Sequence, residues 1–483
     1  MKLSDYTKYD GLGLAALIRN TEVSVQEVGQ TTLEAIAKIN PRLNAVIDIY
    51  PERATGSRPS ELQDGPFFGV PLLLKDLGIM EEGKKVELGS RLAEGMVAPF
   101  SSELMTRYNR AGFNNLGRTT CPEFGFSCAT ESVLRGPTNN PWNTGRVAGG
   151  SSGGAAASVA AGLVPIAHGN DAGGSIRVPA ACCGVFGLKP TRGRISLAPG
   201  GDGLNGLANE HVLSRSVRDS AAVLDSTHGF LPGDPYGASP PHRPYLEECQ
   251  RDPKPLKIAF CKLPNGGNSV DPEIAGLVEQ AAAVCEGLGH SVEEAAPTWD
   301  EEAFINSSAT IWGANCAAMG DRIAFLAGRE ISADTVEAIT LTSYRFGKTV
   351  SGEAFVNALE TANQISRQVA PFFERFDILL TPTLSKDPCA HGHYSMNDFS
   401  GSVEEWFASL SEFVFCTSIY NTTGQPAMSL PLFISTAGLP VGMQFAARYG
   451  EEGTLFQLAG QLERACPWED RIPPVHVSAM TKE

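Results

Sequence analysis

The segment between residues 136 and 194 constrains the fold more than any other part of the chain. It holds the densest Gly and Ser of the sequence and almost no acidic residues. The run GGSSGG (149–154) leads directly into the helix-forming run AAASVAAGL (155–163), and LVPIAHGND (163–171) then predicts a strand. A second Gly-Gly-Ser (173–175) follows that strand. Its position predicts a tight backbone turn and not a flexible linker.

Strand-like and helical stretches alternate along the rest of the chain. Short apolar runs that predict buried strands lie at 68–74, 256–263 and 377–383, with two more within 421–445. Helical patterns cover 272–288, where Pro stands at the start, and most of 302–373. No linker rich in Pro, Ser or charge separates these parts. The sequence therefore predicts one α/β domain built around a mixed sheet.

Charge and hydropathy exclude several classes of protein. Lys and Arg total 38 against 54 Asp and Glu, which gives a net charge of −16. Phosphate binding needs a basic stripe, so we expect no nucleic-acid partner. No stretch approaches the length of an apolar membrane span, and the N-terminus lacks the apolar core of a secretion signal. The 11 Cys form no CxxC pair, which is typical of reduced thiols in a cytoplasmic protein.

Three segments carry residues with chemical potential: GVPLLLKDLG with Lys75, GGSSGG with Ser151, and HGNDAGGSIRVPA with Ser175. Each has an ordinary structural interpretation, because a Lys at a strand end is usually exposed and a Gly-Ser run is often a linker. Together they fit acyl transfer. A Ser hydroxyl is a weak nucleophile that needs a base, and a Lys is a base only when neutral. Burial behind the apolar run 70–74 would lower the pKa of Lys75 and make it neutral.

Two further elements of acyl transfer are present in the same segments. A second Ser can pass a proton between the Lys and the nucleophile. Backbone N–H groups within 171–175 can form an oxyanion hole, because Gly lets the backbone approach a substrate closely.

Three other motif matches have weaker support. Residues 149–153 match GxSxG, but no strand precedes the Ser as a nucleophile elbow requires. Residues 201–206 match GxGxxG without the strand before and the helix after that a dinucleotide site needs. Cys389, His391 and His393 lack the fourth ligand of a structural zinc site, so an ordinary loop is the favoured interpretation.

Taken together, the three segments resemble the signature of the amidase signature family. Ser175 lies 24 residues after Ser151, and Lys75 lies 76 residues before it. Supporting stretches are NPRLNAVID (40–48), GRTTCPEFG (117–125), GPTNNPW (136–142), CGVFGLKPTRGRIS (183–196), ILLTPT (378–383), NTTGQPAMSLP (421–431) and GLPVGMQ (438–444). Residues 168–171 and the ending QLERACPW (461–468) look like the branch that contains 6-aminohexanoate cyclic-dimer hydrolases.

The resemblance implies a role for each residue of the signature. Ser175 would be the nucleophile, Ser151 the bridging Ser after a cis peptide bond, and Lys75 the base. The oxyanion-hole amides would come from Ala172, Gly173, Gly174 and Ser175. Ser152, Asp171 and Arg177 would support the loop. The residues implied to contact substrate are Phe124, Gly125, Phe126, Ser127 and Trp312.

The resemblance also implies a fold and a domain layout. The fold would be a single α/β/α domain over residues 1–483, with a central mixed, mostly parallel twisted sheet of about eleven strands covered by helices. Residues 70–200 would form the catalytic core. Residues 300–350 and 385–420 would be variable segments that shape the substrate pocket.

The function implied is hydrolysis of small to medium, apolar or aromatic amides, linear or cyclic, with anilides, esters and carbamates as further candidates. No metal or organic cofactor is called for, and the partner would be a small-molecule amide, with no membrane and no nucleic acid. A homodimer stays open. The alternative is the amidase component of a tRNA-dependent amidotransferase complex.

Overall fold

An eleven-stranded sheet forms the centre of the molecule, in the order β1-β3-β2-β6-β8-β7-β12-β13-β11-β9-β10. The computed structural model describes residues 1–55, 62–263 and 269–479. The strands of this sheet are β1 (Val46–Ile49), β2 (Pro71–Lys75), β3 (Asn114–Thr119), β6 (Ile166–Asp171), β7 (Phe186–Lys189), β8 (Asn209–Ser214), β9 (Lys257–Phe260), β10 (Ser291–Glu294), β11 (Ile378–Pro382), β12 (Ala427–Ile434) and β13 (Pro440–Ala447). A separate hairpin joins β4 (Glu131–Ser132) to β5 (Gly136–Pro137).

The sheet is mixed. Parallel ladders join β3 to β2, β2 to β6, β11 to β9 and β9 to β10. Antiparallel ladders run from β6 through β8, β7, β12 and β13 to β11, and β1 pairs antiparallel with β3. The expected single α/β domain with a mixed sheet of about eleven strands is confirmed.

Helices cover both faces of the sheet. Those before and within the signature are α1 (Leu3–Tyr6), α2 (Gly11–Arg19), α3 (Val25–Leu43), α4 (Glu52–Thr55), α5 (Glu103–Ala111), α6 (Gly153–Ala160) and α7 (Arg177–Cys183), with the short 3₁₀ turns η1 (Arg91–Ala93) and η2 (Glu123–Gly125). Those after it are α8 (Gly203–Gly206), α9 (Val217–Thr227), α10 (Tyr245–Glu248), α11 (Pro272–Gly287), α12 (Glu301–Ala327), α13 (Ala338–Thr349), α14 (Gly352–Val369), α15 (Phe372–Arg375), α16 (Val403–Val414), α17 (Ile419–Thr423) and α18 (Glu452–Ala465).

Strand β2 shows how the two faces are filled. All five of its residues are buried, and Leu72 and Leu74 pack into the core beneath α5, α9, α11 and α18. Leu73 points to the opposite face and packs into the core formed with α6 and α7. This alternation follows from the period-2 geometry of a strand, and burial on both sides explains why the run is continuously apolar.

The apolar spacing of residues 12–49 predicts helices, with Pro41 at the end of the second one. The structure differs from this expectation at Pro41. The capping box of Ser24 and Glu27 begins α3 as that sequence pattern predicts. Pro41 does not end the helix, which continues to Leu43 and stops at Asn44 in the left-handed conformation. Pro41 removes one hydrogen bond from the last turn, but the turn still closes because the Asn44 N–H donates to the Asn40 carbonyl at 2.7 Å.

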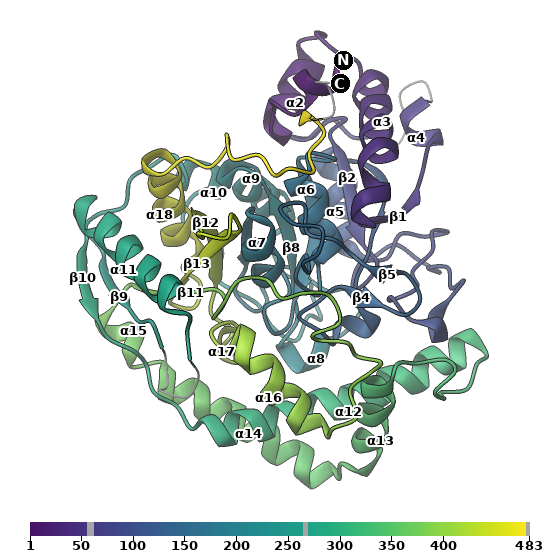
Figure 1. The fold of residues 1–483 in the computed structure, drawn as a ribbon, viewed down its shortest axis with the longest axis vertical. Coiled ribbons are helices and arrows are strands. Elements are labelled where there is room, and N and C mark those ends of the chain that lie inside the picture. The colour runs from purple at the N-terminus through teal and green to yellow at the C-terminus, as the bar shows by residue number, and fades with distance from the viewer. Residues whose placement is uncertain (56–61, 264–268, 480–483) are drawn as a thin grey trace.

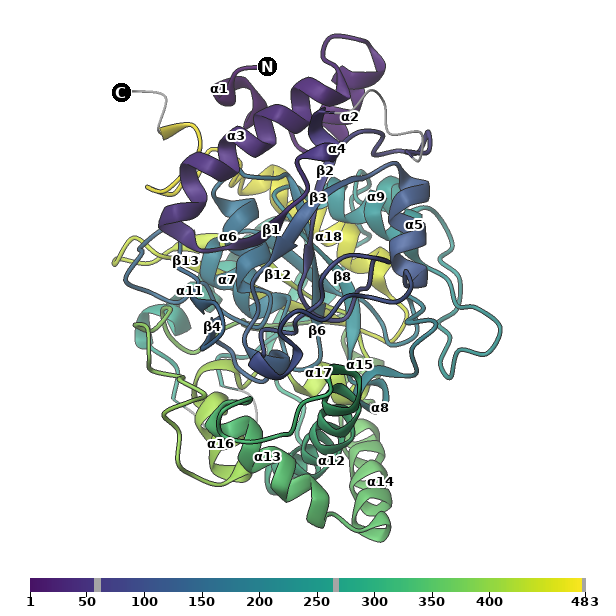
Figure 2. The same cartoon turned by 90° about the vertical axis from the view of Figure 1, so that its right-hand side faces the viewer.

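Helices α12, α13, α14 and α16 gather at one end of the molecule, opposite α2 and α3 (Figures 1 and 2). Within residues 1–55, 62–263 and 269–479, no helix is both long enough and apolar enough to cross a lipid bilayer.

The contact between α12 and α13 depends on two glycines. An ideal Cβ on Gly347 would lie only 1.9 Å from the carbonyl oxygen of Gly313. The two backbones therefore approach more closely than any side chain at residue 347 would allow. Because the clash is with backbone, no rotamer change can relieve it.

We expect Gly347→Ala to lower the free energy of unfolding by about 1–3 kcal/mol, because the added methyl group forces α13 away from α12. Gly276→Ala on α11 is the matched control, since nothing lies within 4 Å of its Cβ position. That control should stabilise the protein by about 0.5–1 kcal/mol through helix propensity. Urea unfolding of both variants measures the difference, and equal effects would contradict the close-approach argument.

Candidate active site

Lys75 ends strand β2 with its side chain fully buried. Its Nζ atom lies 2.7 Å from Ser151 Oγ and donates to Asn170 Oδ1 at 2.6 Å. Strands β2 and β6 are parallel neighbours, so their carboxyl ends bring Lys75 and Asn170 to the same edge of the sheet. Burial lowers the pKa of the Lys75 ammonium to about 8. This shift makes the neutral amine, which is the form that can act as a base, accessible near pH 8.

Ser151 lies in the turn that leads into α6. The peptide bond between Gly150 and Ser151 is cis, as the family resemblance implies. Ser152, the next residue, joins the neighbouring segments: its N–H donates to the Ser175 carbonyl at 3.2 Å and its Oγ donates to the Asn170 carbonyl at 3.2 Å. The two Gly-Ser segments, which are well separated in the sequence, therefore lie against each other.

The loop that carries Ser175 is held by a buried ion pair. Both Asp171 oxygens accept from the Arg177 guanidinium at 2.9 Å, and both side chains are fully buried. Arg177 also donates to the Thr417 carbonyl, Gln444 Oε1 and Asn421 Oδ1, each at 2.8 Å. Burial raises the pKa of Asp171, but the Arg177 charge and hydrogen bonds outweigh burial and hold that pKa well below its usual range. The carboxylate is therefore ionised and serves as a fixed acceptor.

The backbone amide of Gly174 is not available for an oxyanion hole, in contrast to the expectation from the sequence. Its N–H donates to Asp171 Oδ1 at 2.7 Å, while the carbonyl of the same peptide unit, on Gly173, accepts from Thr417 Oγ1 at 2.6 Å. Contacts on both sides fix this peptide plane with its N–H directed away from the cavity. The amides of Ala172, Gly173 and Ser175 have no such partner among the described residues, so they remain the candidate donors.

An open cavity of about 940 Å³ lies over Ser175. Gly150, Ala172, Gly173, Gly174 and Ser175 form its floor. The predicted residues Gly125, Phe126, Ser127 and Trp312 also line it. The Trp312 ring lies 5.3 Å from the ring of Phe126 and 5.9 Å from that of Phe407, measured between centroids. One part of the wall is therefore aromatic.

Phe124 is not among the residues that line this cavity. It is 4% exposed and packs into the core, where its ring meets Phe126 edge to face at a centroid distance of 6.5 Å. The backbone of η2 turns at Phe124, which has a φ of 52°. Phe124 thus supports Phe126 from behind the cavity wall.

Several lining residues were not identified from the sequence. They lie on α12, α13, α16 and the turns beside them, and include Phe304, Ile305, Ser343, Trp406, Phe407 and Leu410. The apolar spacing of 403–414 and the capping box of Ser402 and Glu405 both indicate α16, but neither signal says which cavity the helix covers.

A buried His–Glu pair lies behind Lys75. The His168 Nε2 atom is 2.7 Å from Glu210 Oε2, and His168 Nδ1 accepts from the Lys75 backbone N–H at 3.3 Å. Because Nδ1 is an acceptor, Nε2 carries the proton and donates to Glu210. Burial lowers the pKa of His168, which keeps the ring neutral.

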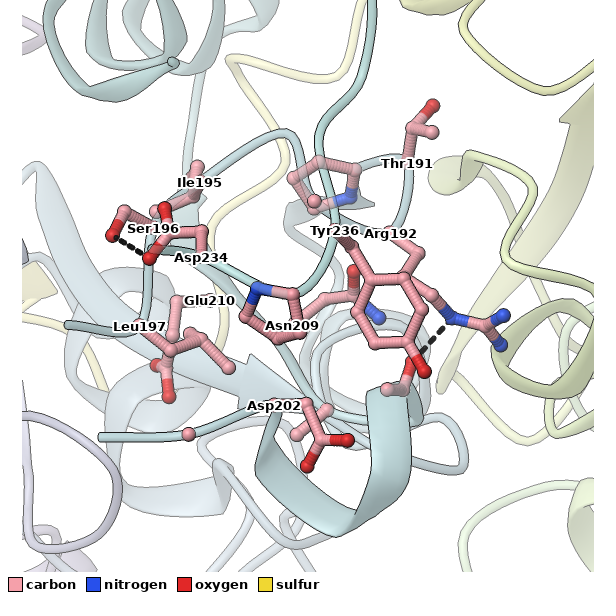
Figure 3. Close-up of a pocket in the computed structure, with 16 residues that line it drawn as sticks. Thr191, Arg192, Ile195, Ser196, Leu197, Asp202, Asn209, Glu210, Asp234 and Tyr236 are labelled. Carbon is pink, nitrogen blue, oxygen red and sulfur yellow. Dashed lines mark hydrogen bonds between the residues drawn. The ribbon is translucent and has the colours of Figure 1, made fainter. Parts of the chain in front are cut away.

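Glu210 also borders a second cavity (Figure 3), which is lined by Gly206 and Ala208, whereas Leu207 lines the first. Asp202, Asp234 and Tyr236 lie around it, and Asp234 accepts from Ser196 Oγ at 3.0 Å. Arg192 borders this cavity and donates from Nε to the Gly206 carbonyl at 2.6 Å. Arg192 also donates to the carbonyls of Asn421 and Thr422, and therefore holds the partition between the two cavities in place.

Comparison with known proteins agrees with this geometry. The family model named Amidase matches residues 27–456. The 6-aminohexanoate-cyclic-dimer hydrolase of Paenarthrobacter ureafaciens is 38% identical over 475 residues, which cover 96% of each chain. The solved structure of a 6-aminohexanoate cyclic dimer hydrolase has a TM-score of 0.92 and covers 97% of this chain and 99% of its own. The solved structure of a glutamyl-tRNA(Gln) amidotransferase subunit from Thermotoga maritima has a TM-score of 0.74 at 25% identity, over 99% of this chain and 98% of its own.

The fold and these matches define the protein as a hydrolase that acts on amides. The chain belongs to the amidase signature family.

We expect Arg177→Met to lower the free energy of unfolding by about 3–5 kcal/mol, because it leaves the Asp171 carboxylate buried without its partner. Lys348→Met is the matched control: its pair with Asp321 is about half exposed on both sides, so its loss should cost at most about 1 kcal/mol. The double variant Asp171→Asn/Arg177→Met should lose less than the sum of its single variants. Strict additivity in chemical unfolding would contradict a direct charge interaction.

Proposed function

We propose that this amidase cleaves small to medium, apolar or aromatic amides by acyl transfer to Ser175, with Lys75 as base and Ser151 as proton relay. One observation carries the proposal: the amine of Lys75 is fully buried and lies 2.7 Å from Ser151 Oγ, while Gly150, the residue before Ser151, lines the same apolar cavity as Ser175. Residues 70–200 would then form the catalytic core, and 300–350 with 385–420 the substrate-shaping segments.

The first half of the reaction forms the acyl-enzyme. Neutral Lys75 accepts a proton from Ser151, which accepts the proton of Ser175 as Ser175 Oγ bonds to the amide carbonyl carbon. The carbonyl electron pair moves onto oxygen, where the amides of Ala172, Gly173 and Ser175 stabilise the charge. When the C–N bond breaks, Ser151 returns a proton to the leaving nitrogen and regains one from the Lys75 ammonium.

The second half releases the acid. Water attacks the ester carbonyl of the acyl-enzyme and gives up its proton through Ser151 to Lys75. The tetrahedral intermediate then collapses, Ser175 leaves as an alkoxide, and the relay returns the proton to it. Substrate amide and water are thus converted to acid and amine, and the relay needs no metal or organic cofactor.

The lining of the cavity supports the substrate class. The Cβ position of Gly173 lies 3.9 Å from the Trp312 ring, so an acyl or amine group bound at Ser175 would meet an aromatic surface. The cyclic dimer in the names of the 38% identical relatives has two amide bonds on aliphatic linkers. Linear and cyclic amides with apolar bodies are therefore the first substrates to test, followed by anilides, esters and carbamates.

A second candidate function is that of the amidase component of a tRNA-dependent amidotransferase. The match to the amidotransferase structure from Thermotoga maritima favours it. The closer likeness to a cyclic-dimer hydrolase and the net charge of −16 favour the hydrolase. Co-purification with a tRNA-binding partner would favour the amidotransferase.

We expect Ser175→Ala to lower amide hydrolysis by ~10⁴-fold or more, and Lys75→Met by ~10²–10⁴-fold, because each variant breaks the relay. A panel of aliphatic amides, anilides and lactams assayed with the wild type and both variants tests this. Unchanged activity in Ser175→Ala would rule out Ser175 as the nucleophile. Full activity in Lys75→Met would rule out Lys75 as the base but would leave the nucleophile in place.

The pH dependence of wild-type kcat/KM follows from the pKa of Lys75, which burial lowers to about 8. The neutral amine is the active form, so kcat/KM should rise with pH and level off above about 8. Below that value it should fall about tenfold for each pH unit. A profile that falls as the pH rises through 8 would mean that the ammonium is the active form.

We expect Trp312→Ala to change the preference of the enzyme for acyl size. Removing the indole should lower kcat/KM for a benzoyl anilide by about tenfold, because a ring contact in the cavity is lost. Bulkier acyl groups that fill the vacated space should lose less. Phe325→Ala is the control, because Phe325 lies on the same helix with 85% of its surface exposed. If Trp312→Ala left the ratio of kcat/KM between the benzoyl anilide and bulkier substrates unchanged, the acyl group would not bind against Trp312.

A further inference from the structure

The amide side chain of Asn170 lies between the amine of Lys75 and the backbone that follows β2. Its Oδ1 atom accepts from Lys75 Nζ at 2.6 Å, and its Nδ2 atom donates to the Leu77 carbonyl at 2.9 Å. Among the described residues, Asn170 and Ser151 are the two side chains hydrogen-bonded to the Lys75 amine. Asn170 is 9% exposed.

These contacts permit one orientation of the Asn170 amide. Rotating the amide by half a turn would place its oxygen against the Leu77 carbonyl, a repulsive contact, and the donation from Nδ2 to that carbonyl would be lost. The backbone closes over the amide, because a Cβ on Gly78 would lie 2.4 Å from Asn170 Nδ2. The acceptor that faces Lys75 is therefore fixed.

We infer that Asn170 is a positioning residue that orients the amine of Lys75 toward Ser151. A neutral amine has two N–H bonds and one lone pair. An N–H directed at the fixed oxygen of Asn170 leaves the lone pair free to face the hydroxyl of Ser151, which is the direction a proton must take. This inference rests on the proposed role of Lys75 as base.

The neutrality of Asn170 is part of the same role. The charged or titratable side chains around Lys75 are Asp76, Arg118, Cys121, His168, Asp171 and Glu210. Asp171 is paired with Arg177, and Glu210 with His168. Asn170 contacts the amine directly and supplies an acceptor without a negative charge, whereas a carboxylate at that distance would favour the ammonium form and remove the base.

The test compares Asn170→Asp, which has nearly the same shape but adds a charge, with Asn170→Leu, which has no acceptor. The readouts are the pH profile of kcat/KM on a benzoyl anilide and the rate at which a fluorophosphonate probe labels Ser175. In Asn170→Asp the acidic limb should move up by at least one pH unit, labelling at pH 7 should fall at least tenfold, and activity should recover at high pH. In Asn170→Leu, kcat should fall at least tenfold at every pH while KM stays within about twofold.

Asn205→Asp is the matched control. Asn205 accepts from Asn315 at 2.7 Å and has no contact with Lys75, so the same added charge should leave the limb in place. Thermal unfolding of each variant separates misfolding from a loss of orientation. The inference would be overturned if the acidic side of the kcat/KM pH profile stayed in place in Asn170→Asp and kcat of Asn170→Leu equalled that of the wild type. Normal labelling of Ser175 in Lys75→Met would instead overturn the proposed function, so the two failures are distinguishable.

Discussion

The buried amine of Lys75 is the constraint on which the rest of the site depends. An ammonium ion taken out of water is costly unless it is paired, and the side chains that contact this amine are a hydroxyl and an amide. The apolar residues of β2 remove water from its stem, and the parallel ladder with β6 brings Asn170 level with it. The sheet therefore does more than support the site. It creates the surroundings in which a lysine can act as a base near neutral pH.

Asp171 and Arg177 are also buried, but unlike the amine of Lys75 they form an ion pair. Here both groups stay charged, and every oxygen and nitrogen that faces the loop has a partner. A lysine whose pKa burial lowers to about 8 and an ionised carboxylate thus lie close together at one edge of the sheet. The amine is desolvated without a counter-ion, whereas the carboxylate is desolvated beside one. Environments that push titratable groups apart in this way are typical of sites that perform acid–base chemistry.

How much could be predicted from the sequence depended on how local each feature is. The segments with Lys75, Ser151 and Ser175 were identifiable because glycines, serines and an apolar strand leave a signal within a few residues. The direction of the Gly174 amide could not be predicted, because it depends on the hydrogen bond from Thr417, more than 240 residues away along the chain. The same holds for Phe124 and Phe126: they are two residues apart and both aromatic, yet long-range packing places only the second at the cavity. Helix α3 continues past Pro41 because the Asn44 N–H closes its last turn on the Asn40 carbonyl, and the proline alone does not predict that cap.

The residues proposed to perform the chemistry and those proposed to select the substrate lie in different layers of the fold. The residues proposed to move protons lie at strand ends and in the turns of the central sheet, where ladders and the Asp171–Arg177 pair restrict motion. The aromatic cover comes from α12 and α16, which pack at the end of the molecule away from α2 and α3 (Figure 2). Helix α12 contacts α13 through two glycine backbones, so Trp312 and Ser343 lie on helices whose separation is fixed by main-chain contact. Because side chains on this cover can change without moving Lys75 or Ser151, the proposed proton relay is compatible with amides of different size and shape.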